Sequence, residues 1–259
     1  MTQQNDPLER IVTAYADAFS HLAGATTGRT RRGAHGSVLA VSGAPTAALN
    51  MIVSTTREAS VEEIIELADA ERLGEEGPPW SIRVRGVPGP EVTAVAARYG
   101  LTRHEREPLM LRHSDQGVPN GPTPKDFHVR AVPVDELHVY ARTVADGFEA
   151  PPELFQVLAD PAVGNIDGMT FYLAELGGVP VGTGMTATAG DVAGIFNITT
   201  LPEFRRRGYG RATVSEMVRA GHMAGAATSY LYAWDMGRRV YESLGFRTEE
   251  YLTVITAPD

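Results

Sequence analysis

One stretch of the sequence joins a strand-like segment to a turn that is rich in arginine and glycine. Residues 195–201 contain several β-branched and aromatic side chains, and Pro202 follows them. The turn contains the residues that could bind an anion, which are Arg205, Arg206, Arg207, Gly208, Tyr209, Gly210 and Arg211. A glycine-bearing turn that opens a helix exposes unpaired backbone N–H groups, and the helix dipole adds partial positive charge. The pattern predicts an anion site suited to a pyrophosphate, while a basic helix start without a ligand explains the same residues equally well.

A second candidate group lies farther along the chain, in the segment Tyr241-Glu242-Ser243-Leu244-Gly245-Phe246. A positioned phenol can act as a general acid, which typically contributes about 10²- to 10⁴-fold to a rate. The alternative is that Tyr241 is a core aromatic side chain that packs against Leu244 and Phe246. Spacing alone leaves both interpretations open.

Several other chemistries have no candidate residues in this sequence. There is no cysteine, which excludes disulfides, thiolate zinc sites and cysteine nucleophiles. Lys125 is the only lysine and lies in a proline-rich segment, so a Schiff-base or P-loop lysine is not expected. The seven histidines show no ligand spacing such as His-Glu-x-x-His, and we therefore expect no metal site.

The charge balance narrows the class of partner. With 23 basic and 32 acidic side chains the formal net charge is −9, which disfavours nucleic acid and favours an amine-bearing partner. No apolar run reaches the length of about 18 residues that a membrane helix needs. The first residues lack the basic start and apolar stretch of a signal peptide. We therefore expect a cytoplasmic protein that does not bind membranes.

Hydrophobic periodicity predicts two domains of mixed strands and helices, joined by a linker. We expect a smaller N-terminal α/β domain at 1–113, a linker at 114–125 and a second domain at 126–259. The linker contains three prolines and two glycines. In the first domain we expect a polar basic loop at 26–33, and a helix that opens with the capping box Ser60-Val61-Glu62-Glu63. The other expected elements of the first domain are helices at 8–22 and 90–99 and strands at 37–41, 50–54, 80–84 and 109–111.

The glycine turn and the tyrosine segment occur together in an order that resembles the GNAT superfamily of N-acetyltransferases. The matching residues are Ile198-Thr199-Thr200-Leu201-Pro202, then Arg205-x-x-Gly208-x-Gly210, then Tyr241-Glu242-x-Leu244-Gly245-Phe246. The resemblance covers about residues 127–259. It implies a GNAT-like mixed central sheet flanked by helices, with acetyl-coenzyme A as co-substrate between two splayed parallel strands.

The resemblance also implies roles for individual residues. Backbone groups of Ile198, Thr199 and Thr200 would hold the thioester carbonyl and the pantetheine arm. The turn at 205–211 would bind the pyrophosphate, and Tyr241 would protonate the departing thiolate. Many family members carry an asparagine shortly before the tyrosine, whereas this chain has Trp234-Asp235 there. For the general base, the sequence offers Asp191 and Glu175 without choosing between them.

The leading hypothesis is an N-acetyltransferase in which an amine, on a small molecule or a protein, attacks the thioester directly. The alternative is a non-catalytic acyl-coenzyme A sensor or structural module, and a third hypothesis is an anion binder built on Arg29, Arg31 and Arg32. The chain could be a monomer or a homodimer. The first half lacks the glycine turn, but its expected helix and strand at 91–111 parallel those at 237–255. It could therefore be a degenerate GNAT-like domain or an unrelated α/β cap.

Overall fold

The computed structural model of the protein describes residues 6–74, 77–119 and 124–258. Contacts divide the chain into a first unit, residues 1–107 with 250–259, and a second unit, residues 108–249. The first unit contains α1 (Glu9–Ala25), β1 (Arg29–Arg32), β2 (Ser37–Val41), η1 (Ala47–Leu49), β3 (Asn50–Ser54), α2 (Val61–Ala70), β4 (Ser81–Arg85) and α3 (Pro90–Arg98). Two strands, β5 (Arg103–His113) and β11 (Arg247–Thr256), have residues in both units.

The second unit contains the elements that carry the candidate site. They are η2 (Ser114–Gln116), β6 (Phe127–Ala131), η3 (Val134–Glu136), α4 (Leu137–Phe148), η4 (Pro152–Ala159), η5 (Val163–Asn165), β7 (Met169–Leu176), β8 (Val179–Ala189), β9 (Val192–Thr200), η6 (Pro202–Phe204), α5 (Tyr209–Met223), β10 (Thr228–Tyr232) and α6 (Asp235–Ser243).

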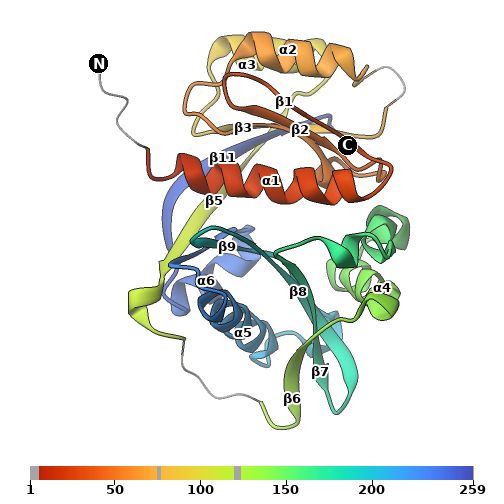
Figure 1. The fold of residues 1–259 in the computed structure, drawn as a ribbon, viewed down its shortest axis with the longest axis vertical. Helices are drawn as coiled ribbons and strands as arrows, with labels where there is room; N and C mark the ends of the chain where they lie inside the picture. The colour runs from red at the N-terminus through yellow and green to blue at the C-terminus, as the bar shows by residue number, and fades with distance from the viewer. Residues whose placement is uncertain (1–5, 75–76, 120–123, 259) are drawn as a thin grey trace. The chain divides into compact units, whose positions relative to one another are not determined.

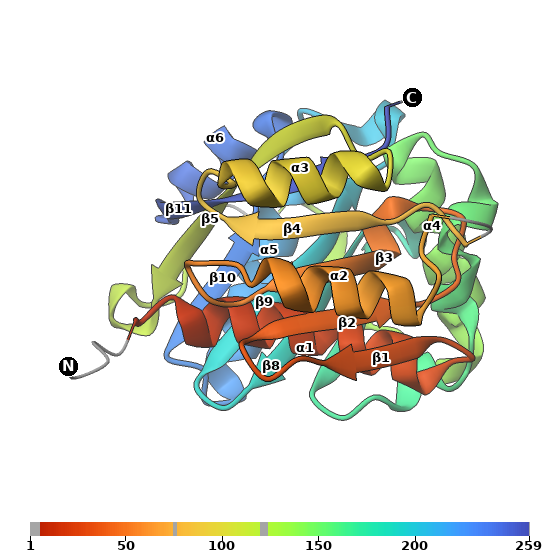
Figure 2. The same cartoon turned by 90° about the horizontal axis from the view of Figure 1, so that it is seen from above.

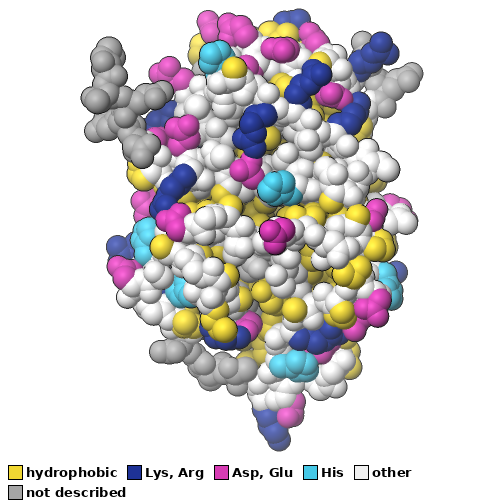
Figure 3. All heavy atoms as spheres, in the orientation of Figure 1, with side chains coloured by type: hydrophobic (Ala, Val, Ile, Leu, Met, Phe, Trp, Pro, Cys, Tyr) yellow, Lys and Arg dark blue, Asp and Glu magenta, His cyan; other side chains and the backbone are white. Residues whose placement is uncertain are grey.

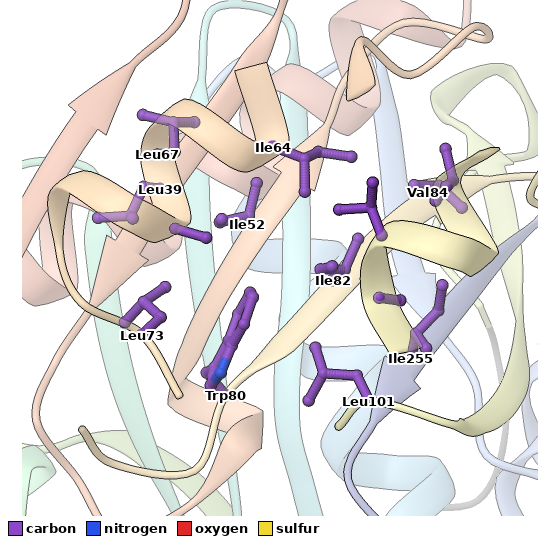
Figure 4. Close-up of a cluster of buried hydrophobic side chains, with 14 of the residues drawn as sticks. Leu39, Ile52, Ile64, Leu67, Leu73, Trp80, Ile82, Val84, Leu101 and Ile255 are labelled. Carbon is purple, nitrogen blue, oxygen red and sulfur yellow. The ribbon is translucent and has the colours of Figure 1, made fainter. Parts of the chain in front are cut away.

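In the first unit, the strand order is β1-β2-β3-β4-β11, and only β3 and β4 run parallel. Helices α2 and α3 cover one face of these strands and α1 covers the other (Figures 1 and 2). Figure 4 shows the core beneath α2, where Ile64 and Leu67 pack over strand residues such as Ile52. Ile255 of β11 joins the same cluster, so the end of the chain completes this core.

The start of α2 shows how local sequence sets an element. The Ser60 hydroxyl accepts a hydrogen bond from the Glu63 N–H at 3.3 Å, which is the predicted N-cap. The Glu63 carboxylate does not complete the capping box. It accepts the backbone N–H groups of His35 and Ser37, and it thereby holds the β1–β2 turn against the helix.

In the second unit, the strand order is β5-β10-β9-β8-β7-β6, and only β9 and β10 run parallel. Neighbouring residues of β8 show that α4 and α5 lie on opposite faces, because successive side chains of a strand alternate between faces. Gly184 lies against Met217 of α5, whereas Thr183 bonds to Thr199, which contacts Gly147 of α4. Figure 1 shows the same two helices.

The last strand of each unit comes from the other half of the sequence. β5 follows α3 in the chain but pairs antiparallel with β10, from Thr228↔His113 to Tyr232↔Leu109. β11 follows α6 but pairs antiparallel with β4, from Leu252↔Arg85 to Thr256↔Ser81. The structure therefore divides the chain differently from the predicted domains 1–113 and 126–259. Long-range strand pairing, rather than the position of the proline-rich segment, sets the boundary.

Two further predictions are corrected. The expected basic loop at 26–33 contains strand β1, which pairs with β2 from Arg29↔Val41 to Arg32↔Val38. The expected strand at 109–111 is the buried end of the longer β5. Within the expected linker 114–125, residues 114–116 form η2, and residues 120–123 lie outside the described part of the chain. The strands predicted at 37–41 and 50–54 are confirmed.

Candidate functional site

The parallel strands β9 and β10 diverge after a short stretch of pairing. Val192, Ala193 and Gly194 pair with Thr228, Ser229 and Tyr230. β9 then continues to Thr200, and within the described residues no strand pairs with the β10 side of this remainder. Apart from the Thr200 carbonyl, which accepts the Arg205 guanidinium, the backbone N–H and C=O groups on that side are therefore available to a ligand.

A β-bulge at Asn197 marks the point of divergence. Against β8, Phe196 pairs with Met185 and Thr199 pairs with Thr183, so two residues of β9 stand opposite one residue of β8. Asn197 has a φ of 50°, and its carbonyl accepts the Thr183 hydroxyl at 2.7 Å. A bulge bends a strand and increases its twist, which accounts for the separation of β9 from β10.

The turn after β9 is braced by Arg205. Its guanidinium donates to the carbonyl oxygens of Thr200 at 3.1 Å and Gly147 at 2.9 Å, and it pairs with Glu149 at 2.7 Å. These contacts tie the turn to the C-terminal end of α4. The Arg205 side chain thus makes its polar contacts within the protein, whereas the sequence predicts a direct contact between this side chain and the cofactor.

The N-terminus of α5 is left open by the same turn. Gly208 is the N-cap residue with a φ of 85°, and no side chain caps the helix. A Cβ at Gly208 would meet no atom within 4 Å, and the first turn of α5 contains no acidic residue. The N–H groups of Gly208, Tyr209 and Gly210 donate no hydrogen bond to another described residue. These features fit an anion, because the free N–H groups and the helix dipole act together.

The other predicted residues of this turn differ in what they can do. Arg206 is exposed with a φ of 63°, and the Arg207 guanidinium lies 5.9 Å from the centre of the Phe204 ring. The Tyr209 side chain is buried against Phe127, with ring centroids 5.1 Å apart, so it anchors the helix start. Arg211 donates to the Ser243 hydroxyl at 3.0 Å and so connects α5 to α6.

Tyr241 is half-buried on α6, one helical turn after Gly237. Its ring packs edge-on to Phe246, with centroids 6.2 Å apart. A Cβ at Gly237 would lie 2.7 Å from Cε2 and 3.0 Å from the hydroxyl oxygen of Tyr241. The absence of a side chain at 237 therefore lets the phenol lie over the first turn of α6. The hydroxyl bonds to no other described residue, and burial raises the pKa of Tyr241 to about 12, so the phenol is protonated at neutral pH.

Neither carboxylate considered as a general base lies on the unpaired side of β9, because Glu175 is on β7, beyond β8, and Asp191 precedes β9. Glu175 is buried on β7, where it pairs with Arg130 at 2.9 Å and with His128 at 2.8 Å. Asp191 precedes β9, seven positions before Ile198, which corresponds to about 23 Å along an extended strand. The structure thus removes both residues from the list of candidate bases.

Three aromatic side chains lie together at the site: Phe148 belongs to the segment 148–152 in which the sequence suggests an acceptor pocket, whereas Phe155 and Trp234 were not among the predicted functional residues. The Phe148 ring at the end of α4 lies 5.6 Å from Phe155 of η4 and 5.5 Å from Trp234, which precedes α6. The exposed fraction of Trp234 is 58%. In the sequence, Trp234 was noted only as a departure from an expected asparagine, and no spacing rule connects it with Phe148.

Other regions offer less for chemistry. Arg29 pairs with Glu71 at 3.0 Å and Arg32 pairs with Asp17, so two cations of the proposed basic loop are already compensated. Among the described side chains, acidic and basic groups are interspersed on the face shown in Figure 3. The described residues contain no cluster of three or more potential metal ligands and no helix able to cross a bilayer.

Comparison with known proteins agrees with this geometry. Residues 167–248 match the family model of the acetyltransferase (GNAT) domain. A GCN5-related N-acetyltransferase from Kribbella flavida has a similar structure, with a TM-score of 0.70 and 18% identity over 98% of this chain and 97% of that chain. For a GCN5-related N-acetyltransferase from Sphaerobacter thermophilus the TM-score is 0.57 and the sequence identity 15%, over 96% of this chain and 93% of that chain. For a functionally unknown conserved protein from Staphylococcus epidermidis the TM-score is 0.65 and the sequence identity 14%, over 89% of this chain and 94% of that chain. No curated protein sequence matches the chain.

Proposed function

We propose that the chain is an acetyltransferase of the GNAT type that transfers an acetyl group from acetyl-coenzyme A to an amine, and the GNAT domain match at 167–248 and the GNAT-like fold support this proposal. The observation that carries this proposal is the uncapped N-terminus of α5 directly after a strand whose edge is open. The uncapped helix N-terminus fits a pyrophosphate, and the open strand edge fits an amide-containing arm that can pair with it.

Two groups of residues would hold the cofactor, and one residue, Tyr241, would assist the reaction. The backbone at Arg206, Arg207, Gly208 and Gly210 would bind the pyrophosphate, with Arg205 bracing the turn. Backbone groups from Ile198 to Thr200 would hold the pantetheine arm and the thioester carbonyl. A fixed N–H aimed at that oxygen stabilises the negative charge that develops on it, by roughly 3–4 kcal/mol in comparable sites.

The chemistry needs no covalent enzyme intermediate. The amine nitrogen attacks the thioester carbon, a C–N bond forms, the C–S bond breaks and coenzyme A leaves as the thiolate. The amine loses one proton to water, and the thiolate gains one. A thiol has a pKa near about 8.5, whereas that of Tyr241 is about 12. Full transfer from this phenol is therefore unfavourable, and we assign to the Tyr241 hydroxyl a hydrogen bond that stabilises the developing charge on sulfur.

On this proposal the first unit does not bind the cofactor. It repeats the order of three strands, a helix, a parallel strand and a further helix, as β1-β2-β3-α2-β4-α3 against β7-β8-β9-α5-β10-α6. Both series end with a glycine of positive φ, Gly100 and Gly245, followed by a strand. We take the first unit to be a GNAT-like half that lacks a cofactor turn.

Release of coenzyme A thiol with a panel of amines tests the function. An acetyltransferase releases thiol with at least one amine and forms the N-acetyl product. A sensor or structural module would bind acetyl-coenzyme A and release no thiol with any amine. We further propose a cytoplasmic location and an acceptor on a small molecule or a protein, in a monomer or a homodimer.

A further inference from the structure

The aromatic cluster of Phe148, Phe155 and Trp234 presents an apolar surface to solvent. The Phe148 and Phe155 rings stack with an interplanar angle of 18°, and the Trp234 indole leans on Phe148 at 46°. Trp234 is 58% exposed, and the neighbouring Met236 is 86% exposed. Large exposed apolar side chains that gather in one place commonly mark a binding surface.

The cluster lies toward the same end of the sheet as the predicted thioester position. β9 and β10 are parallel, and Trp234 follows the end of β10, so it lies toward the end of the sheet to which β9 also runs. Phe148 reaches the same end of β9, because the preceding Gly147 contacts Thr199. The Trp234 carbonyl oxygen also accepts the Gly237 N–H at 2.9 Å at the start of α6, about two helical turns before Tyr241.

A carboxylate accompanies these rings. Asp146 pairs with Arg142 and Glu149 pairs with Arg205, so both of these carboxylates are already compensated. Glu153, in the first turn of η4 and two residues before Phe155, is exposed and pairs with no cation in the described chain. Glu153 therefore adds an uncompensated negative charge to the segment that carries Phe155, in a chain of net charge −9, and such a charge attracts an ammonium group.

We propose that the acceptor is a primary amine that carries an aromatic ring on a short chain. The ring packs on Trp234 and Phe148, Glu153 attracts the ammonium form, and the deprotonated nitrogen attacks the thioester. This inference rests on the proposed function, and it makes Trp234 a specificity-determining residue. An aromatic ring gains more than an alkyl chain here, because offset and edge-on ring contacts add to the burial of apolar area.

Tryptophan fluorescence gives a test that does not depend on turnover. The chain has two tryptophans, and Trp80 is 4% exposed while Trp234 is 58% exposed, so a ligand on the cluster perturbs mainly Trp234. The full chain is titrated with 2-phenylethylamine and with n-butylamine. We expect a saturable change whose midpoint is at least about tenfold lower for 2-phenylethylamine. The change should be lost in Trp234→Phe and weakened in Glu153→Gln. Equal midpoints for the two amines would overturn the inference.

Steady-state kinetics then separates this inference from the proposed function. Trp234→Ala should raise KM for 2-phenylethylamine about tenfold and leave KM for acetyl-coenzyme A within about twofold. Met223→Ala removes another exposed apolar side chain, 74% exposed at the end of α5, and should change neither. If alkylamines support thiol release and Trp234→Ala does not change its rate, the proposed acetyltransferase function would stand and the inference of an aromatic acceptor would be overturned. A saturable fluorescence response without thiol release from any amine would keep the aromatic-amine site and overturn the acetyltransferase.

Discussion

The connections β3–α2 and β9–α5 occupy equivalent places in the two units, yet only one is open to an anion. At α2 the Ser60 hydroxyl caps the helix, and Glu62 and Glu63 lie in its first turn. At α5 the cap is Gly208, which has no side chain, and the first turn contains no acidic residue. A cap satisfies the N–H groups that an anion would need, and acidic residues repel it. The difference between the units at this point therefore lies in a few side chains and not in the order of elements.

The strands before these helices differ in the same sense. β3 pairs with β4 through Met51, Ile52 and Val53 and ends one residue later. β9 pairs with β10 over three residues but extends six residues farther, to Thr200. The bulge at Asn197 has no counterpart in the uninterrupted β2–β3 register. An unpaired strand edge and an uncapped helix end thus occur together at the β9–α5 connection, and both are missing from the β3–α2 connection.

The largest expected contrast is in binding stoichiometry. At its β3–α2 connection the first unit has a strand paired on both sides and a capped helix end, so we expect one coenzyme A per chain. Isothermal titration calorimetry of the full chain measures the number directly. A stoichiometry of two would show that the capped α2 end binds as well, and the comparison would fail.

Placing an acid on α5 should make it behave like α2. Gly210 is the second residue of α5, the position that Glu62 holds on α2, so Gly210→Glu transfers the acidic first turn. We expect the Kd for acetyl-coenzyme A to rise about 100-fold or more, because like charges repel at short range. Gly210→Gln controls for size, since a Cβ there would lie 3.2 Å from the Thr200 hydroxyl oxygen. Equal Kd values for the Glu and Gln variants would contradict the anion site.

Tyr241→Phe removes one hydrogen-bond donor and keeps the ring. We expect kcat to fall at least about tenfold with an unchanged Kd for acetyl-coenzyme A, because the donor acts on charge that develops in the transition state. Steady-state turnover with one accepted amine gives the value. A kcat within about twofold of the parent would mean that Tyr241 is only a packing residue.

Gly237→Ala should lower kcat by a smaller factor, roughly three- to tenfold, by displacing the Tyr241 phenol. Alanine favours a helix over glycine by up to about 1 kcal/mol, so the loss would not come from a weaker α6. Arg239→Ala, an exposed position of the same helix, is the matched control. In a Tyr241→Phe background the change at 237 should have no further effect on kcat. Additive losses in the double variant would assign Gly237 some other role.

The smallest expected effect is that of pH on the Tyr241 contribution. Burial raises the pKa of Tyr241 to about 12, so its protonated form persists above the ordinary tyrosine range. The ratio of parent to Tyr241→Phe kcat should therefore stay constant from about pH 6 to about pH 10. A ratio that falls to one with a midpoint below about pH 10 would show that the phenol ionises earlier than its burial implies.

Local sequence predicts much of this fold. The Ser60 cap and the strands at 37–41 and 50–54 all rest on nearby residues, and all appear as expected. β1 was missed because an exposed edge strand made of arginine and threonine has no buried alternation to read. The strand exchange was missed because partners separated by more than 100 residues leave no trace in local pattern.

In the candidate site, too, the features that depend on local sequence were predicted and those that depend on distant contacts were not. The glycines of the turn and Tyr241 follow from motif spacing. The bracing role of Arg205 depends on where Gly147 and Glu149 lie, and these residues come from a helix far earlier in the chain. The same is true of Phe148 beside Trp234. Contacts between distant segments are set by tertiary packing, which a spacing rule does not encode.

The exchange of last strands also has a consequence for biosynthesis. β4 is translated long before β11, the partner that completes its antiparallel edge between Ser81 and Arg85. At about 5–20 residues per second, a ribosome would need roughly 10–30 s to travel from one strand to the other. Throughout that interval the nascent first unit carries an unpaired strand edge, a known template for aggregation. The half of the protein that is made first is therefore finished last, and chaperone contact in that window should matter more for this chain than for one whose halves close independently.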